Sequence, residues 1–432
     1  MTKQRLRPSD KRAGAGSIAG TAEEQRRFGA ILSRKQVTSL YQPIISLRTG
    51  TTVAYEALAR GPHGSPLESP DALFAAARRY GRLAELEWQC RAAAVRGALD
   101  ADLGAQTSLF LNVEPSIVGN IMPPEVDQLF RAAERRLRLV LELTERDLCR
   151  RPAELLAFVQ WARERWWGIA LDDVGAEPES LALLPFLEPD VIKLDMRIVH
   201  EPPSAESERL LDAVRAEATR TGAVVLAEGI ENEEHLARAR ELDVALVQGW
   251  YFGRPAPLSE APSHRDVVPL RLQPPQVADT PFDVISGTGE GKRMPVAKVL
   301  ELIRDAERES IDDLSRNVVL ACFGGRGLFT PDIAARYADL AREAVFVGAV
   351  GLGLPQEPAP GVRSTPLDER DALAHQLAVA IVGPDRSVAV AARLPKGEVR
   401  PTDVVQVFTS TSRETVLKVG RLVMGRVVPA YR

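Results

Sequence analysis

The chain has 432 residues, of which 45% are hydrophobic and 26% are charged, and its formal net charge is −4. This length suits two domains of roughly 100–200 residues each, and the composition is that of an ordinary globular protein. A small negative charge does not indicate an electrostatic nucleic-acid binder, so we expect no nucleic acid among the partners. Residues 1–24 are locally basic and rich in glycine, and we predict a disordered leader there.

Cysteine and histidine are too scattered to suggest a metal site of their own. Cys90, Cys149 and Cys322 lie far apart without CxxC spacing, and the five histidines are dispersed. This pattern argues against a disulfide framework and against zinc. No stretch approaches the roughly 18 uninterrupted apolar residues of a membrane span, and the N-terminus lacks the apolar core of a signal peptide. We therefore expect a cytoplasmic protein.

Strand-like apolar runs alternate with helical segments from residue 25 to residue 258. The predicted helices span residues 22–36, 69–101, 124–138, 152–166, 204–221 and 231–242. Such alternation is typical of βαβ units around a mainly parallel sheet. Eight strands with their helices fit roughly 230 residues, which is close to the usual size of a (β/α)8 barrel. The sequence therefore predicts an α/β fold with a TIM-type barrel in this first domain.

A second, smaller domain follows the barrel. We assign the proline-rich residues 259–279 to a linker and residues 280–432 to this domain. We expect strands at residues 317–323, 344–352, 376–383 and 387–394 and helices at residues 296–308 and 331–342. Thr330 suits the N-cap of the second helix, and Thr411 with Glu414 has the spacing of a capping box for a final helix. The pattern predicts a small α/β domain with a largely antiparallel sheet.

Seven apolar runs of the first domain carry polar residues suited to a metal ion or a phosphate. If the strands point their C-terminal ends one way, these groups meet at the face where barrel active sites lie. Any one of them alone is explained as readily by a helix cap or a turn. Seven at successive strand ends favour a functional site. The residues are Glu56, Asn112, Glu142, Glu145, Asp172, Asp173, Lys193, Glu228, Glu231 and Gln248.

Hard oxygen ligands dominate this set and indicate Mg²⁺ or Mn²⁺ rather than zinc or copper. Without a cation, carboxylates around one mouth would repel one another and raise one another's pKa values. Two ions would instead clamp a phosphodiester and lower the pKa of a bridging water. Lys193 would then stabilise the attacking hydroxide or act near it as a base. The candidate ligands are Glu56, Asn112, Glu142, Asp172 and Asp173.

Short motifs along the first domain resemble those of the EAL domain family over residues 25–258. They are YQPI at 41–44, EALAR at 56–60, LNV at 111–113, ELTE at 142–145, DD at 172–173, KLD at 193–195, EGIE at 228–231 and QGWYFGRP at 248–255. The resemblance implies a modified TIM barrel in which one strand runs antiparallel. It also implies a phosphodiesterase that linearises cyclic di-GMP to pGpG with two Mg²⁺ or Mn²⁺ ions.

The resemblance implies a role for each matching residue. The implied metal ligands are Glu56, Asn112, Glu142 and Asp172, with Asp173 at the second metal. The implied catalytic and supporting residues are Lys193 at the nucleophilic water, Glu228 and Glu231 near the metal site, and Glu145 bracing the loop after Asp173. The implied substrate contacts are Gln42, Arg60 and Gln248, with Arg60 near a phosphate because its planar fork matches phosphate oxygens.

The loop after Asp173 departs from the family's usual Phe-Gly-Thr/Ala-Gly-Tyr. Residues 174–179 read Val-Gly-Ala-Glu-Pro-Glu, so the backbone options differ and negative charge is added. An enzyme is the favoured interpretation, since all the ligands are intact. One alternative is a catalytically weak or inactive EAL domain that binds cyclic di-GMP through Gln42 and Arg60 and signals to a protein partner. Another is a barrel hydrolase for a different phosphodiester.

The C-terminal domain resembles the DICT domain over residues 280–425. The resemblance lies in FDVIS at 282–286, the helix near Glu307, Cys322-Phe323, Phe329-Thr330 and YADL at 337–340. It implies a sensory, regulatory role, while a structural or partner-binding role is the alternative. No residue cluster identifies its ligand or protein partner. For the barrel, the resemblance to the EAL family also suggests a homodimer.

Overall fold

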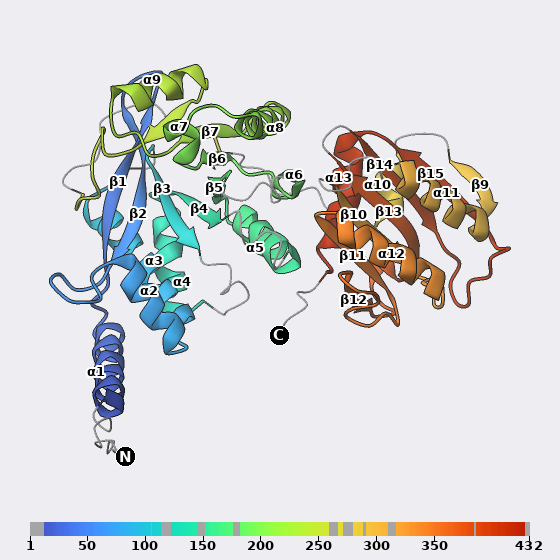
Figure 1. Cartoon of the computed structure of the whole chain (residues 1–432), viewed down its shortest axis with the longest axis horizontal. Coiled ribbons are helices and arrows are strands. Elements are labelled where there is room, and N and C mark those ends of the chain that lie inside the picture. The colour runs from blue at the N-terminus through green and yellow to red at the C-terminus, as the bar shows by residue number, and fades with distance from the viewer. Residues whose placement is uncertain are drawn as a thin grey trace, which may run out of the picture. The chain divides into compact units, whose positions relative to one another are not determined.

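The computed structural model describes most of the chain, and Figure 1 labels its helices and strands. None of the helices in the described residues combines the length and apolar character that crossing a membrane requires. The described residues are 13–104, 106–113, 122–144, 152–175, 182–258, 267–270, 280–287, 291–309, 317–383 and 386–427.

Eight strands form a closed barrel in the order β1 to β8, as the sequence predicts. The first strand runs antiparallel to the second, and the printed pairings of β2–β3, β5–β6, β6–β7 and β7–β8 are parallel. The predicted modified TIM barrel with one antiparallel strand is thus confirmed. The strands are β1 Thr38–Ser46, β2 Thr52–Arg60, β3 Ser108–Val113, β4 Arg138–Thr144, β5 Gly168–Val174, β6 Val191–Leu194, β7 Val224–Ala227 and β8 Leu246–Gln248.

Continuous burial of β4 and β6 explains how two charged residues come to lie inside the barrel wall. Strands covered on both faces are continuous apolar runs, because neither face meets water. Strand β4 buries the five residues from Leu139 to Leu143, and β6 buries all four of its residues. Glu142 and Lys193 are the charged members of these runs. Since burying a charge is costly unless it is paired, both side chains need partners inside the barrel.

The helices of the first domain depart from the prediction in two places. Helix α1 begins at Ala13, so the second half of the predicted disordered leader is helical. The single helix expected at residues 69–101 is two helices, separated where Gly81 adopts a φ of +65°. Glycine takes this left-handed conformation without strain. The helices are α1 Ala13–Ser33, α2 Pro70–Arg79, α3 Leu83–Asp100, α4 Pro124–Ala133, α5 Pro152–Glu164, α6 Leu184–Leu187, α7 Arg197–His200, α8 Ala205–Thr221 and α9 Glu233–Glu241.

The C-terminal domain is built on a seven-stranded sheet in the order β12-β11-β10-β13-β14-β15-β9. Pairs β10–β11 and β11–β12 are parallel and the other four pairs are antiparallel, so the predicted, largely antiparallel sheet is confirmed. The strands are β9 Lys292–Pro295, β10 Val318–Phe323, β11 Phe346–Leu352, β12 Arg363–Leu367, β13 Gln376–Val382, β14 Ser387–Arg393 and β15 Val404–Ser410.

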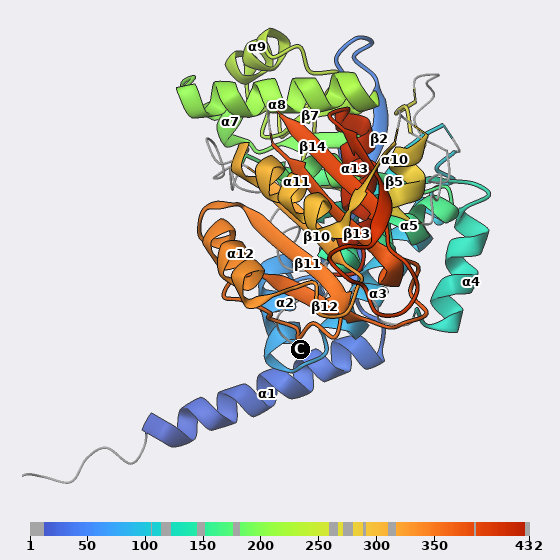
Figure 2. The ribbon, with the colours of Figure 1, turned by 90° about the vertical axis from the view of Figure 1, so that its right-hand side faces the viewer.

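Helices cover both faces of this sheet (Figures 1 and 2). Strand β10 is buried throughout, and its alternate residues serve different helices. Phe323 belongs to a core that includes Ile303 of α11 and Tyr337 of α12. Leu320, on the opposite face, lies against Gly420 of α13. The helices are α10 Pro281–Ser286, α11 Val296–Glu309, α12 Pro331–Glu343 and α13 Arg413–Met424, with a short 3-10 helix at Ala372–His375.

Of the two predicted helix caps of this domain, one is confirmed and the other is wrong. The hydroxyl of Thr330 accepts a hydrogen bond from the backbone N–H of Ile333, as expected of an N-cap. The capping box at Thr411 and Glu414 is wrong, because α13 begins after Ser412 and this N-cap side chain makes no capping hydrogen bond. Glu414 instead pairs with Lys418, 2.8 Å away on the next turn. Side-chain pairing four residues apart competes with the box for the same carboxylate.

Candidate active site

Lys193 is the centre of a buried charged cluster. Its side chain on β6 is 1% exposed, and its Nζ lies 2.7 Å from Oε1 of Glu142 and 2.7 Å from Oδ1 of Asp172. The same Nζ is 2.8 Å from Oε1 of Glu228. The three carboxylates come from β4, from β5 and from the residue after β7. One ammonium with three donors therefore contacts three carboxylates from three different segments.

A second acidic group overlaps the first. Asp172, Asp173 and Glu228 place ligand oxygens within 4.8 Å of one another. Asp173 adopts a φ of +57°, a conformation that Asp tolerates better than most residues. Because Lys193 supplies one positive charge among several carboxylates, this part of the site retains excess negative charge. Clustered carboxylate oxygens of this kind fit a hard divalent cation such as Mg²⁺ or Mn²⁺.

Glu56 forms a separate hydrogen-bonded group with three amide side chains. Its Oε1 accepts from Nδ2 of Asn112 at 3.0 Å, and its Oε2 accepts from Nε2 of Gln248 at 2.7 Å. The antiparallel register places Gln42 of β1 directly opposite Glu56 of β2. Gln248 Nε2 also donates to Oε1 of Gln42 at 3.3 Å. Glu56 lies in the middle of β2. The expectation that the polar residues lie at strand ends therefore does not hold for Glu56.

Gln248 presents one acceptor that no side chain or backbone group of the described residues uses. Its side chain is 3% exposed, yet Oε1 lacks a hydrogen-bond partner among them. A buried polar atom of this kind is costly unless a ligand or water meets it. Within the part of the chain that the structure describes, Nε2 of Gln42 donates one hydrogen bond, to the carbonyl of Gly253 at 3.3 Å, which leaves its second N–H without an acceptor there. Both glutamines are therefore equipped to contact a bound molecule.

Three other predicted residues are not brought into these groups. Nη1 of Arg60 donates to the adjacent carbonyl of Ala59 at 2.8 Å, and its side chain is half-buried. Glu231 is exposed, and its backbone nitrogen lies 3.3 Å from Nδ1 of His235. Glu145 lies outside the described residues, as does the unusual sequence at 176–179. Their predicted roles therefore stay predictions.

Two histidines that sequence reasoning missed lie beside this site. His200 and His235 stack on each other and both approach the carbonyl of Gly229, the residue after Glu228. Neither belongs to a recognised motif, and the atom they share is a backbone oxygen. The available signal was weak: His235 lies three residues after Asn232, which suits a helix N-cap.

The fold and these side chains together define a barrel of the class that carries acidic, metal-type sites on its strands. Residues 23–255 match the family described as the EAL domain. Because this match covers more than half of the chain, the protein belongs to the EAL domain family.

Two curated relatives and one solved structure illustrate the similarity. The probable cyclic di-GMP phosphodiesterase PdeG of Escherichia coli is 30% identical over 255 residues, covering 57% of this chain and 48% of the relative. The cyclic di-GMP phosphodiesterase RocR of Pseudomonas aeruginosa is 31% identical over 233 residues, covering 52% and 59%. The solved structure of the PaMucR phosphodiesterase in complex with c-di-GMP is 24% identical, with a TM-score of 0.47, covering 55% of this chain and 98% of that one. The chain spans about half the length of the two curated relatives.

Proposed function

We propose that this protein is a metal-dependent phosphodiesterase that hydrolyses cyclic di-GMP to linear pGpG. The observation that carries the proposal is the cluster of Glu142, Asp172 and Glu228 around the buried Lys193. Asp173 extends this cluster into a group of oxygens with the chemistry of a divalent-cation site. Membership of the EAL family supports the choice of reaction, since related proteins are named as cyclic di-GMP phosphodiesterases.

Each group of residues has a proposed task. Bound Mg²⁺ or Mn²⁺ would neutralise phosphate charge and lower the pKa of a water molecule. Lys193 directs its Nζ toward three carboxylates and so holds them in place for ligand binding. The proposed ligands of two ions are Glu56, Asn112, Glu142, Asp172 and Asp173. The proposed supporting residues are Glu145, Glu228 and Glu231, and the proposed substrate contacts are Gln42, Arg60 and Gln248.

The test is chromatography of cyclic di-GMP after incubation with the full chain and Mg²⁺ or Mn²⁺. The wild type should form pGpG, and Glu56→Ala should abolish it by removing the carboxylate that Asn112 and Gln248 orient. Glu301→Ala is a matched control, because this carboxylate is exposed on α11 and pairs with Lys298 of the same helix. Normal turnover by Glu56→Ala would show that the assignment of the site is wrong.

A cyclic di-GMP receptor is the second candidate function. The sequence Ala-Glu-Pro-Glu at 176–179, next to the aspartate pair, motivates it because it adds charge and a rigid proline near the site. The receptor hypothesis predicts saturable binding of cyclic di-GMP with no pGpG at any concentration of Mg²⁺ or Mn²⁺. Restoring a Gly-rich loop at these positions should then produce hydrolysis. Turnover by the unmodified protein would exclude this candidate.

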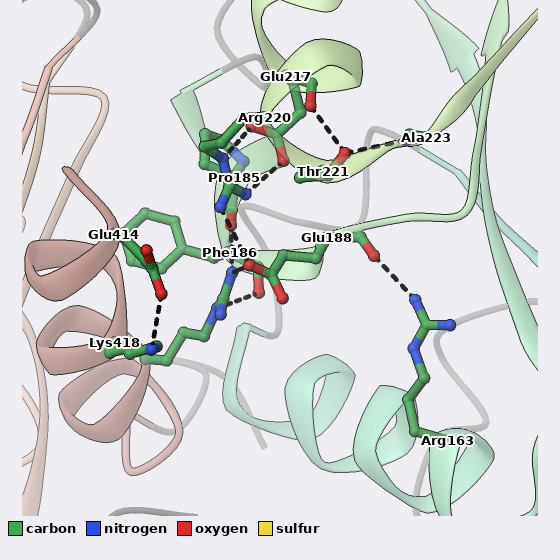
Figure 3. Close-up of polar contacts among 11 residues, drawn as sticks. Arg163, Pro185, Phe186, Glu188, Glu217, Arg220, Thr221, Ala223, Glu414 and Lys418 are labelled. Atoms are coloured by element: carbon green, nitrogen blue, oxygen red, sulfur yellow. Dashed lines mark hydrogen bonds and ion pairs between the residues drawn. The ribbon is translucent and has the colours of Figure 1, made fainter. Parts of the chain in front are cut away.

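We also propose that the C-terminal domain, sensory by its DICT-like resemblance, regulates the barrel through α13. Arg421 on this helix donates from Nη2 to the carbonyl of Pro185 at 2.6 Å and from Nε to that of Phe186 at 3.0 Å. It also pairs with Glu188, 2.7 Å away. These three residues, labelled in Figure 3, lie in the connection between β5 and β6. This connection joins the strands that carry Asp172 and Lys193.

Glu188 is the hub of this contact. It adopts a φ of +48° and pairs with Arg220 as well as with Arg421. Burial opposes its ionisation, but the charges of Arg421 and Arg220 outweigh burial and hold the pKa of Glu188 below its ordinary value. Its carbonyl accepts from Arg163 at 2.8 Å (Figure 3). A shift of α13 would therefore disturb the ion pairs and hydrogen bonds of Glu188 in this turn of the barrel.

Arg421→Ala tests the regulation proposal. Hydrogen exchange of residues 182–194 should become faster and turnover should change by at least two-fold, because three carbonyl and carboxylate contacts are lost. Lys418→Ala is the matched control, since Lys418 lies on the same helix and pairs within it with Glu414. Unchanged exchange and turnover in Arg421→Ala would mean that this contact does not transmit regulation.

A further inference from the structure

Two stacked histidines flank the loop that follows β7. The ring centroids of His200 and His235 are 3.9 Å apart, with an interplanar angle of 27°. His200 ends α7, the short helix after β6, whereas His235 lies in the first turn of α9. Both are half-buried. The pair therefore joins the segment that follows Lys193 on β6 to the segment that follows Glu228 after β7.

Both rings are directed at one backbone oxygen. Nε2 of His200 lies 2.6 Å from the carbonyl oxygen of Gly229, and Nδ1 of His235 lies 3.2 Å from the same atom. A carbonyl oxygen only accepts, and its two lone pairs can take two donors. The geometry thus assigns a donating N–H to Nε2 of His200 and to Nδ1 of His235.

Asn232 supports this tautomer of His235. As the N-cap of α9, its Oδ1 accepts from the backbone N–H of His235 at 2.9 Å. This hydrogen bond fixes the orientation of the Asn232 side-chain amide, so that its Nδ2 lies 3.4 Å from Nε2 of His235. Nε2 therefore accepts, and the ring proton is on Nδ1, where it faces Gly229. In the other tautomer, Nδ1 of His235 would accept from the backbone N–H of Glu231, 3.3 Å away. Its Nε2 would then carry an N–H that points at the NH₂ group of Asn232, so that two donors would face each other.

Gly229 has little room to move away from the two rings. It adopts a φ of +70°, and a Cβ built on it would lie 2.5 Å from Cβ of Met196 and 3.1 Å from Nε2 of His200. The loop after β7 thus approaches the segment after β6 as closely as a glycine permits. On the strand side, the N–H of Glu228 donates to the carbonyl of Leu194 at 3.3 Å. The peptide before Glu228 and the peptide after Gly229 are therefore both held.

We propose that His200 and His235 are positioning residues that hold the Gly229 carbonyl and thereby keep Glu228 at the active site. The carboxylate of Glu228 lies 2.8 Å from Nζ of Lys193 and belongs to the acidic group with Asp172 and Asp173. Movement of the backbone at Gly229 would shift the adjacent Glu228 and so displace this carboxylate. The expected effect on turnover rests on the phosphodiesterase function proposed above. The expected effect on the position of the loop after β7 does not.

Paired substitutions separate the N–H groups from the bulk of the rings. His200→Leu and His235→Leu remove the donors. His200→Gln places an amide N–H as far along the side chain as Nε2, and His235→Asn places one at the reach of Nδ1. His375→Leu, in the C-terminal domain, controls for the loss of a histidine elsewhere. Phenylalanine variants keep a ring without an N–H and replace any leucine variant that does not fold.

Three measurements on the full chain report on the mobility of the loop after β7, on cation binding and on turnover. Hydrogen exchange across residues 226–236 should become faster in the leucine variants and stay near wild type in the Gln and Asn variants. Mn²⁺ affinity, titrated by electron paramagnetic resonance, should weaken about ten-fold in the leucine variants only, the scale of a lost hydrogen bond to a supporting group. With cyclic di-GMP, kcat should fall about ten-fold with KM within two-fold.

The outcomes distinguish failure of this proposal from failure of the proposed function. Leucine variants with wild-type exchange and wild-type Mn²⁺ affinity would overturn the positioning role. Gln and Asn variants as impaired as the leucine variants would also overturn it, because ring packing rather than the N–H would then matter. If the wild type forms no pGpG, the phosphodiesterase proposal fails, while exchange and Mn²⁺ affinity still decide whether the histidines hold the loop.

Discussion

Replacement of Lys193 by methionine is the sharpest test of the charge arrangement in this barrel. Methionine keeps most of the length of the side chain but removes the ammonium that lies 2.7–2.8 Å from Glu142, Asp172 and Glu228. In metal-free buffer the three carboxylates would then face one another without their cation. We expect the barrel to lose stability, because buried like charges repel and desolvated carboxylates lose their partner.

The size of the effect follows from burial. Removing one partner of a buried ion pair costs about 3–5 kcal/mol. The side chains of Glu142 and Lys193 are 0% and 1% exposed, but those of Asp172 and Glu228 are 13% and 20% exposed, so water offsets part of the loss. The lower end, about 3 kcal/mol, is therefore expected. For a domain of this size it lowers the melting temperature by roughly 6–12 °C.

Tryptophan fluorescence isolates the barrel from the rest of the chain. All five tryptophans lie between Trp88 and Trp250, and two of them, Trp88 and Trp167, are 8% and 3% exposed. Their emission during melting therefore reports unfolding of the barrel and not of the C-terminal domain. Lys298→Met is the matched control, because this lysine is 63% exposed on α11.

Divalent cations give the second half of the test. Mg²⁺ should stabilise Lys193→Met more than wild type, since the cation then replaces the missing charge as well as filling its own site. Neutralising one carboxylate, as in Lys193→Met combined with Glu142→Gln, should recover part of the lost stability. A single variant as stable as wild type in metal-free buffer would refute the reasoning. So would a double variant that is less stable than the single one.

Three further predictions follow from buried groups. Gly229→Ala should lower the melting temperature by several degrees and reduce pGpG formation at least ten-fold, because its Cβ would lie 2.5 Å from that of Met196; wild-type turnover would contradict this. Burial raises the pKa of Tyr41 to about 12. The folded state therefore keeps a proton that the unfolded state releases above pH 10, so about 2–3 kcal/mol of stability present below pH 10 is lost by pH 12. Tyr41→Phe should flatten this decline in the tryptophan-monitored unfolding energy, and an unchanged slope would contradict it. Burial also raises the pKa of the Cys322 thiol, so a disulfide reagent at pH 8 should not label it before unfolding; rapid labelling of the native protein would count against its burial.

Strand order could be predicted from the sequence because it follows from local pattern and alternation. Apolar runs separated by helices leave few ways to build a sheet, and the eight-stranded barrel follows from them. The break at Gly81 could not, because the flanking residues read as one continuous helix and a single glycine is tolerated inside many helices. The start of α13 was missed for a related reason: Glu414 had two possible partners, and the pair with Lys418 is the one formed.

Site residues could be predicted from the sequence where a charged residue interrupts an apolar run. Glu142 and Lys193 stand out as charges inside apolar runs, and their mutual contact is the physical reason that they are tolerated there. Glu231 was singled out by the motif at 228–231 instead, yet the residue is exposed, because a motif does not specify which side of a loop a residue faces. His200 and His235 gave little signal, since their shared partner is a backbone carbonyl that any residue could supply.

The hydrogen bonds around Glu56 limit how Gln248 can contact a ligand. Both N–H groups of Gln248 Nε2 have acceptors, in Oε2 of Glu56 and Oε1 of Gln42, whereas its own Oε1 has none among the described residues. Gln248 can therefore meet a bound molecule only as an acceptor, which suits a water or a base N–H and not a phosphate oxygen. Gln42 is the complement, because its Oε1 accepts from Gln248 and its Nε2 makes one printed donation, to Gly253, so that one N–H has no acceptor among the described residues. If the proposed substrate contacts are right, Gln42 is therefore the one of the two suited to a phosphate oxygen, and Gln248 would orient Glu56 and accept a hydrogen bond from the substrate.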